Sequence, residues 1–109
     1  MPYDELLAIR IRAQLGPLPD LVEKKMFGGV GFLLNGNMAC GVHKDDLIVR
    51  VGAEAYPQAL RRPHARPFDM TGKPMAGWVM VAPAGCAKEG ELKAWLEQGS
   101  AFARTLPGK

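Results

Sequence analysis

The sequence predicts a single α+β domain in which an antiparallel β-sheet, a meander, carries an N-terminal and a C-terminal helix. Two amphipathic helical patterns enclose a run of strand-like segments, and no long helix separates those strands. An Asn35-Gly36 pair lies between two apolar segments, as in a two-residue β-hairpin turn. This order of elements favours an antiparallel meander over alternating βαβ units.

The length of 109 residues suits one domain, and we expect residues 1–109 to form it without an internal boundary. Hydrophobic residues make up 48% and charged residues 23% of the chain, as is ordinary for a water-soluble globular protein. No apolar segment approaches the roughly 20 residues of a membrane helix. Residues 1–5 lack the basic and apolar regions of a secretory signal. These features predict a cytoplasmic protein with no membrane contact.

Each end of the chain carries the helical pattern. Residues 3–15 place apolar side chains four residues apart, and Gly16-Pro17 follows as a stop signal. From Glu89 to Leu106, apolar side chains again recur at helical spacing. We therefore expect both segments to pack on the sheet through one apolar side.

The segments between these helices have strand character, because β-branched and apolar residues are bounded by glycine, proline and asparagine. The expected strands are residues 22–27, 30–34, 37–42, 47–51 and 75–81. A short helical or turn piece at 52–60, limited by Pro57, and an extended piece at 66–70 complete the chain.

The Asn35-Gly36 turn sets the expected register of its hairpin. Counting outward from the turn pairs Phe32 with Ala39 and Gly31 with Cys40. One face then carries Val30, Phe32 and Leu34, and the other carries Leu33, Met38, Cys40 and Val42. Because both faces are apolar, we expect helices on one face and another cover, such as a second subunit, on the other.

No recognisable catalytic or metal-binding pattern is present in the sequence. Cys40 lies in a strand, whereas Cys86 lies in a loop where partial exposure is expected, and both are expected to be reduced thiols. His43 and His64 do not stand at zinc-ligand spacing. A nucleophile–base pair of Cys40 and His43 is disfavoured, because nothing evident orients the histidine. We therefore expect no catalytic residues, no cofactor and no metal.

The densest basic segment, at residues 61–73, is a candidate contact for nucleic acid or for an acidic partner. Its cations are Arg61, Arg62, Arg66 and Lys73. The net charge of +3 and the pI near 9.1 indicate only a weak positive field. The simpler interpretation is a solvated loop whose arginines make local hydrogen bonds.

A short block near the start of the sheet resembles the TfoX/Sxy N-terminal domain family of small bacterial proteins. The residues of this block and of the hairpin that follows are Met26, Phe27, Gly28, Gly29, Asn35 and Gly36. The resemblance extends through residues 66–68 and 77–79 to the helix that contains Trp95, and so covers essentially the whole chain. It implies helices packed on a curved antiparallel sheet and a relation to dimeric chaperone-like folds.

The family is named after a regulator of natural competence, and the resemblance offers no catalytic motif to transfer to residues of this sequence. Two-domain members carry a second, helical domain, and this chain resembles the stand-alone members. We expect a non-enzymatic regulatory or adaptor domain that acts through protein contacts, with a homodimer through an apolar sheet face. Two alternatives remain open: a nucleic-acid-associated regulator that uses the basic loop at residues 61–73, and a small-molecule-binding protein with a pocket near Cys40, His43 or Trp78.

Overall fold

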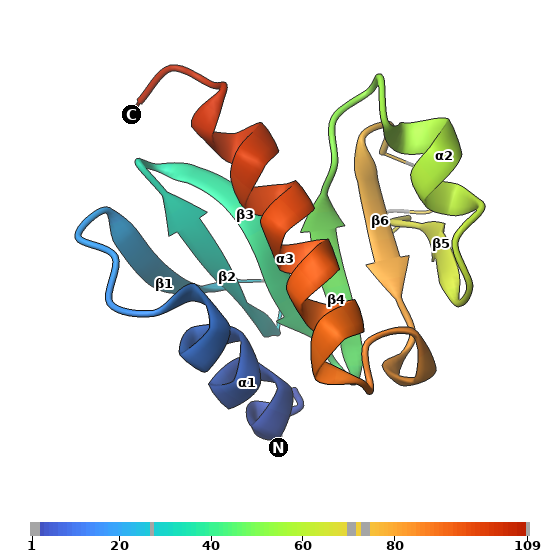
Figure 1. The fold of residues 1–109 in the computed structure, drawn as a ribbon, viewed down its shortest axis with the longest axis horizontal. Helices are drawn as coiled ribbons and strands as arrows, with labels where there is room; N and C mark the ends of the chain where they lie inside the picture. The colour runs from blue at the N-terminus through green and yellow to red at the C-terminus, as the bar shows by residue number, and fades with distance from the viewer. Residues whose placement is uncertain (1–2, 27, 70–71, 73–74, 109) are drawn as a thin grey trace.

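A computed structural model of the chain describes residues 3–26, 28–69, 72 and 75–108. Figure 1 shows two layers, in which two long helices lie side by side on the same face of one antiparallel sheet. The elements in chain order are α1 (Glu5–Leu15), β1 (Leu21–Met26), β2 (Gly29–Leu34), β3 (Asn37–His43), β4 (Asp46–Arg50), α2 (Tyr56–Leu60), β5 (Ala65–Pro67), β6 (Trp78–Val81), η1 (Pro83–Gly85) and α3 (Glu89–Arg104). The predicted α+β class is confirmed.

The six strands pair in the order β1-β2-β3-β4-β6-β5, and every pairing is antiparallel. The predicted meander therefore holds for β1 to β4. It ends there, because β6 pairs with β4 and leaves the three-residue strand β5 at the edge. The sequence shows an extended piece near residue 66 but contains no local signal for this order.

The helix α1 begins at Asp4, whose Oδ1 accepts a hydrogen bond of 3.1 Å from the Leu7 amide. It ends at Gly16, whose φ of 71° lies in the region that favours glycine. The predicted apolar spacing is realised in part, because Leu7 and Ile11 are buried against the sheet layer. The same helix leaves Leu6 and Ile9 exposed at its outer side.

The β2–β3 hairpin confirms the predicted turn. Asn35 and Gly36 have φ values of 53° and 85°, and the two pairs beside the turn, Leu34–Asn37 and Leu33–Met38, have the expected register. A β-bulge then changes the pairing, so that Phe32 lies opposite Cys40. The expected pairs Phe32–Ala39 and Gly31–Cys40 are therefore wrong.

The bulge also corrects the predicted faces of the hairpin. One extra residue, Ala39, sits on the strand β3, so Cys40 and Val42 join Val30 and Phe32 in the core beneath the helices. The helix α3 passes close to this point, since a Cβ placed at Gly99 would clash with the Ala39 carbonyl oxygen. Pairing each residue with one partner, counted outward from the turn, cannot predict a bulge residue that has no partner on the other strand.

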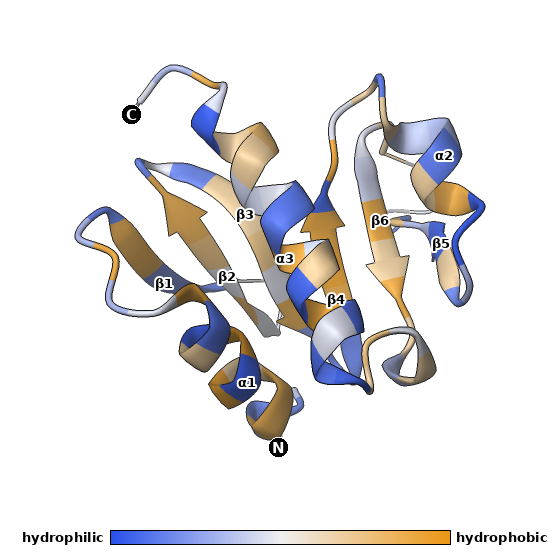
Figure 2. Cartoon of the chain, viewed as in Figure 1, coloured by the Kyte–Doolittle hydropathy of each residue, from blue (hydrophilic) through white to orange (hydrophobic). Residues whose placement is uncertain are grey.

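The main core fills the space between the sheet and the helices. Its largest fully buried side chains include Trp95 and Leu92 of α3, Ile11 of α1 and Phe32 of β2. Figure 2 shows hydrophobic residues along the strands that lie beneath α3, whereas the outer side of that helix is largely hydrophilic. The helices therefore cover one face of the sheet, and the opposite face is left for other contacts.

Other boundaries differ from the expectations in detail. The strand predicted at 75–81 forms only at Trp78–Val81, after a turn in which Gly77 has a φ of 91°. Pro57 lies in the first turn of α2, where its missing N–H has no partner to lose, so it marks the start of that helix and does not limit its length. Phe27, which was expected in the first strand, lies outside the described residues. No helix among the described residues is long and apolar enough to cross a membrane.

Candidate functional site

The sheet has a face that the two long helices do not cover, and we call the side opposite α1 and α3 the far face (Figure 1). Strand alternation identifies its side chains, because Phe32 and Leu34 of β2 pack on the helix side and Leu33 between them must point the other way. Leu33 pairs with Val22 of β1 and with Met38 of β3. These three apolar residues form one row, which we call the apolar strip.

The apolar strip is open to solvent to different degrees. Val22 is 56% exposed, and Leu33 and Met38 are half-buried. Beside the strip, Gly31 and Gly41 pair with each other and carry no side chains. The terminal methyl of Met38 leans over this gap, since it would lie 2.8 Å from a Cβ placed at Gly41. The far face of β1 to β3 is therefore apolar at the strip and carries the two glycines beside it. Lys24 of β1, which pairs with Gly31, faces the same side.

Beyond the apolar strip, toward β4 and β6, the far face carries the cation Arg50 and the aromatic ring of Trp78. The β3–β4 pairing ends at Cys40–Val49, and the next far-face residue along β4 is Arg50, which pairs with Trp78 of β6. The guanidinium carbon of Arg50 lies 5.0 Å from the Trp78 ring centroid and 5.5 Å from that of Phe102 in α3. The Arg50 guanidinium thus lies close to two aromatic rings at the end of β4.

The rest of the far face is covered by the chain itself. Ile48 of β4 and Met80 of β6 are buried beneath Phe68, which follows β5. Phe68 and Trp78 pack with ring centroids 6.1 Å apart. This small second core covers β4 and β6, so the open part of the far face lies over β1 to β3 and ends at Arg50.

Comparison with known families identifies the chain. The family model described as the TfoX N-terminal domain matches residues 13–103. This chain belongs to the TfoX N-terminal domain family. The predicted resemblance is confirmed, and the matched residues include every strand of the far face. No curated protein and no solved structure matches the chain.

The basic loop of this TfoX N-terminal domain is largely engaged with its own chain. Arg62 stacks 3.4 Å from the Trp95 ring centroid and donates a 2.9 Å hydrogen bond to Gln98, and burial lowers the pKa of Arg62. Arg66 forms a 2.6 Å ion pair with Asp46. Arg61 is exposed, and Lys73 lies outside the described residues. Nucleic-acid contact through this loop stays a prediction.

The nucleophile candidates are buried and separated. Burial raises the pKa of Cys40 to about 12, and Cys40 lies on the helix side of β3, whereas alternation places His43 on the far face. Cys86 is also buried, which corrects its expected partial exposure, and burial raises its pKa. Within the described ranges, no three His, Cys, Asp or Glu side chains cluster as a metal site would require.

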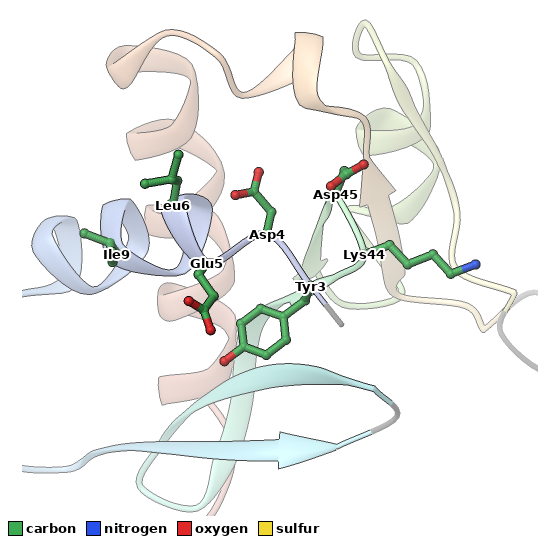
Figure 3. Close-up of a pocket in the computed structure, with 7 residues that line it drawn as sticks. All are labelled: Tyr3, Asp4, Glu5, Leu6, Ile9, Lys44 and Asp45. Carbon is green, nitrogen blue, oxygen red and sulfur yellow. The ribbon is translucent and has the colours of Figure 1, made fainter. Parts of the chain in front are cut away.

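An open groove of about 670 Å³ lies where the N-terminal segment passes the β3–β4 turn. Its lining residues are Tyr3, Asp4, Glu5, Leu6, Ile9, Lys44 and Asp45. Figure 3 shows these side chains pointing in different directions rather than toward a common centre. The groove therefore lacks the convergent polar groups of a catalytic or small-molecule site. Most of its lining precedes the part of the chain that matches the family.

The sequence interpretation did not single out Arg50 as a site residue. A signal for it exists, since Arg50 is the only charged side chain in the apolar segment Leu47–Val51. A lone cation at an alternating position of a buried strand needs a specific neighbour or an exposed strand end. The structure shows a specific neighbour, because the ring of Phe102 in α3 lies near Arg50. That contact joins segments far apart in the sequence.

Proposed function

We propose that this TfoX N-terminal domain is a non-enzymatic regulatory or adaptor domain that binds another protein through the open part of its far face. The observation that carries this proposal is the apolar strip, in which Val22 is 56% exposed beside Leu33 and Met38. A contiguous apolar surface of this kind typically marks a contact site. Membership in a regulator-like family supports the same interpretation.

The chemistry of the cysteines supports a non-enzymatic role. A thiol whose pKa is about 12, as at Cys40, is protonated at neutral pH and is a poor nucleophile.

The edge strand β1 favours contact with a partner through the far face of the sheet rather than by addition of a partner strand to the sheet. That edge, β1, carries Lys24 and Lys25, and charged side chains of this kind discourage pairing between edge strands.

Site-specific photo-crosslinking in the native lysate tests this proposal. A photoreactive amino acid at Leu33 is expected to give a discrete adduct with a protein, and the adduct should survive nuclease treatment. The matched control carries the same group at Ala94, an exposed position on the outer side of α3. Equal adducts at both positions, or none at Leu33, would refute the far face as the contact surface. An adduct that nuclease removes would support the nucleic-acid alternative instead.

A further inference from the structure

Arg50 differs from the other arginines in its hydrogen bonding. The arginines that donate to an acceptor of their own chain are Arg10, Arg12, Arg62, Arg66 and Arg104. Arg61 is exposed and extends into solvent. Arg50 is half-buried, yet its side chain forms no hydrogen bond and no ion pair with the described residues. Its hydrogen-bond donors are therefore available at a sheltered position.

The position of Arg50 is set by flat surfaces rather than by an ion pair. The Arg50 guanidinium carbon lies 5.0 Å from the Trp78 ring centroid and 5.5 Å from that of Phe102, and both rings attract the cation electrostatically. A cation–π contact uses no hydrogen-bond acceptor, so the N–H donors of Arg50 remain free to bind. Phe102 is itself held, because it packs against the buried Gly52 just beyond β4. The arrangement suits a planar oxyanion that meets a preoriented arginine.

The charges of the far face indicate the sign of its partner. Arg66 is neutralised by Asp46, whereas Lys24 and Arg50 have no ion-pair partner in the part of the chain that the structure describes. A second copy that docked face to face would bring its own Lys24 and Arg50 to the same surface. Because like charges disfavour that contact, charge complementarity indicates an acidic partner rather than a homodimer.

The dimensions of the strip indicate the length of the segment that it can accept. Val22, Leu33 and Met38 span two strand spacings, or about 10 Å, and Arg50 lies about one spacing further. An extended chain covers about 3.3 Å per residue. Four or five residues that run across the strands would therefore reach from Val22 to Arg50.

We propose that Arg50 binds a carboxylate of an acidic, apolar segment of a partner protein, whose apolar side chains lie on the apolar strip. This inference rests on the proposed function and specifies the chemistry of the partner. Apolar contacts with Val22, Leu33 and Met38 supply area, while the carboxylate at Arg50 sets the register and direction of the segment. Trp78 borders the bound carboxylate and lies where its environment changes on binding.

The probe for this inference is an acetylated and amidated peptide with the sequence Asp-Leu-Val-Leu and a soluble Gly-Ser tail. Tryptophan emission follows its binding, because Trp78 is half-buried beside Arg50 whereas Trp95 is buried in the main core. We expect saturable binding of this peptide and about tenfold or more weaker binding of the Asn-Leu-Val-Leu control. The Arg50→Gln variant is expected to lose a similar factor toward the acidic peptide.

Matched variants separate the site from the overall charge. Arg61→Gln removes one positive charge at an exposed position and is expected to leave the affinity unchanged. Arg50→Lys keeps the charge but loses the planar fork, so its affinity should lie between those of the native chain and Arg50→Gln. Thermal melting checks that each variant is folded. If Arg50→Gln does not fold, the comparison of Asp and Asn peptides on the native chain and on Arg50→Lys decides the question.

Several results would overturn the inference. Equal affinity for the Asp and Asn peptides, or no detectable binding of either, removes the carboxylate contact. A Leu33 adduct that proves to be a second copy of this chain replaces the acidic partner with a homodimer. If a single-stranded oligonucleotide displaces the peptide from the native chain, and Arg50→Gln binds that oligonucleotide more weakly than the native chain does, Arg50 is assigned to nucleic acid. A protein adduct at Leu33 that Arg50→Gln does not weaken refutes the inference while the proposed function stands.

Discussion

The side chain of Cys40 lies on the helix side of β3, where it has no solvent exposure. Burial there disfavours the thiolate, because a charge in an apolar environment loses its hydration. Cys86 is buried within the loop that precedes α3, and burial raises its pKa as well. At the residue scale, the chemistry of both cysteines is therefore set by packing, and spacing in the sequence says little about it.

We predict that neither cysteine reacts with a thiol-specific disulfide reagent at pH 8 while the protein is folded. With a pKa of about 12, Cys40 is thiolate in only about one molecule in ten thousand at that pH. In guanidinium chloride both thiols should react fully, which provides the control. Absorbance of the released thiol measures the reaction, and rapid labelling of one thiol in the native protein would contradict the buried, protonated state.

At the scale of elements, Arg10 joins α1 to the start of α3. Its Nε donates to Glu89 at 2.7 Å, and its Nη2 donates to the carbonyl oxygens of Cys86 and Ala87 at 2.9 and 3.0 Å. Gln14 adds a 2.9 Å hydrogen bond to the same Glu89 carboxylate. The two helices therefore meet through a planar side chain that reaches three acceptors at once.

We predict that Arg10→Lys lowers the free energy of unfolding by about 1 to 2 kcal/mol, because an ammonium cannot reach all three acceptors in this geometry. Urea unfolding followed by circular dichroism measures the change. Arg61→Lys, at an exposed position, is the matched control and should change the free energy by less than about 0.5 kcal/mol. Equal effects of the two substitutions would show that the Arg10 contacts do not stabilise the helix pair.

The elements themselves were largely predictable from the sequence. Helical periodicity identified both long helices, and the Asn35-Gly36 pair identified the hairpin turn, because each signal is local. The position of β6 between β4 and β5 was not predictable, since it depends on which strand edges meet after the chain has turned. The bulge at Ala39 is not predictable from the local sequence for a related reason: it lies where α3, a helix much later in the sequence, passes close to β3.

At the scale of the whole molecule, ion pairs connect separate parts of the surface. Arg104 of α3 pairs with Asp20 before β1, and Arg12 of α1 pairs with Glu23 of β1. Hydrogen bonds from these arginines lower the pKa of Asp20 and of Glu23, and Arg10 has the same effect on Glu89. Each pair is partly or fully exposed, so salt screens its contribution.

Because the pKa values of these carboxyl groups are lowered in the folded protein, acid is expected to reduce the stability of the fold. A carboxyl whose pKa is lower in the folded than in the unfolded protein stabilises the fold above its unfolded pKa, and that stability is lost as pH falls through the folded pKa. The ordinary values are 3.8 for Asp20 and 4.5 for Glu23 and Glu89. We predict a urea midpoint that is steady from pH 7 to about pH 5 and falls below about pH 4.5.

Arg12→Gln tests the cause of this acid sensitivity. Without its partner, Glu23 should have a more ordinary pKa, so the midpoint of the variant should fall less steeply with acid than that of the native chain. Arg61→Gln serves as the charge-matched control and should keep the native slope. A midpoint that does not change down to pH 3 would contradict a role of these pairs in stability.

The sequence by itself determined the class of the fold, both long helices, the Asn35-Gly36 turn and the family, because periodicity, turn geometry and motif residues are properties of short segments. Only the tertiary structure decided which sheet face stays open and where Cys40 points. It also gave the basic loop its partners, through the stacking of Arg62 on Trp95 and the pairing of Arg66 with Asp46. The same holds for Arg50, whose aromatic neighbours Trp78 and Phe102 come from distant parts of the chain. The physical reason is that burial and contact depend on all the elements packing together, and no single segment contains that information.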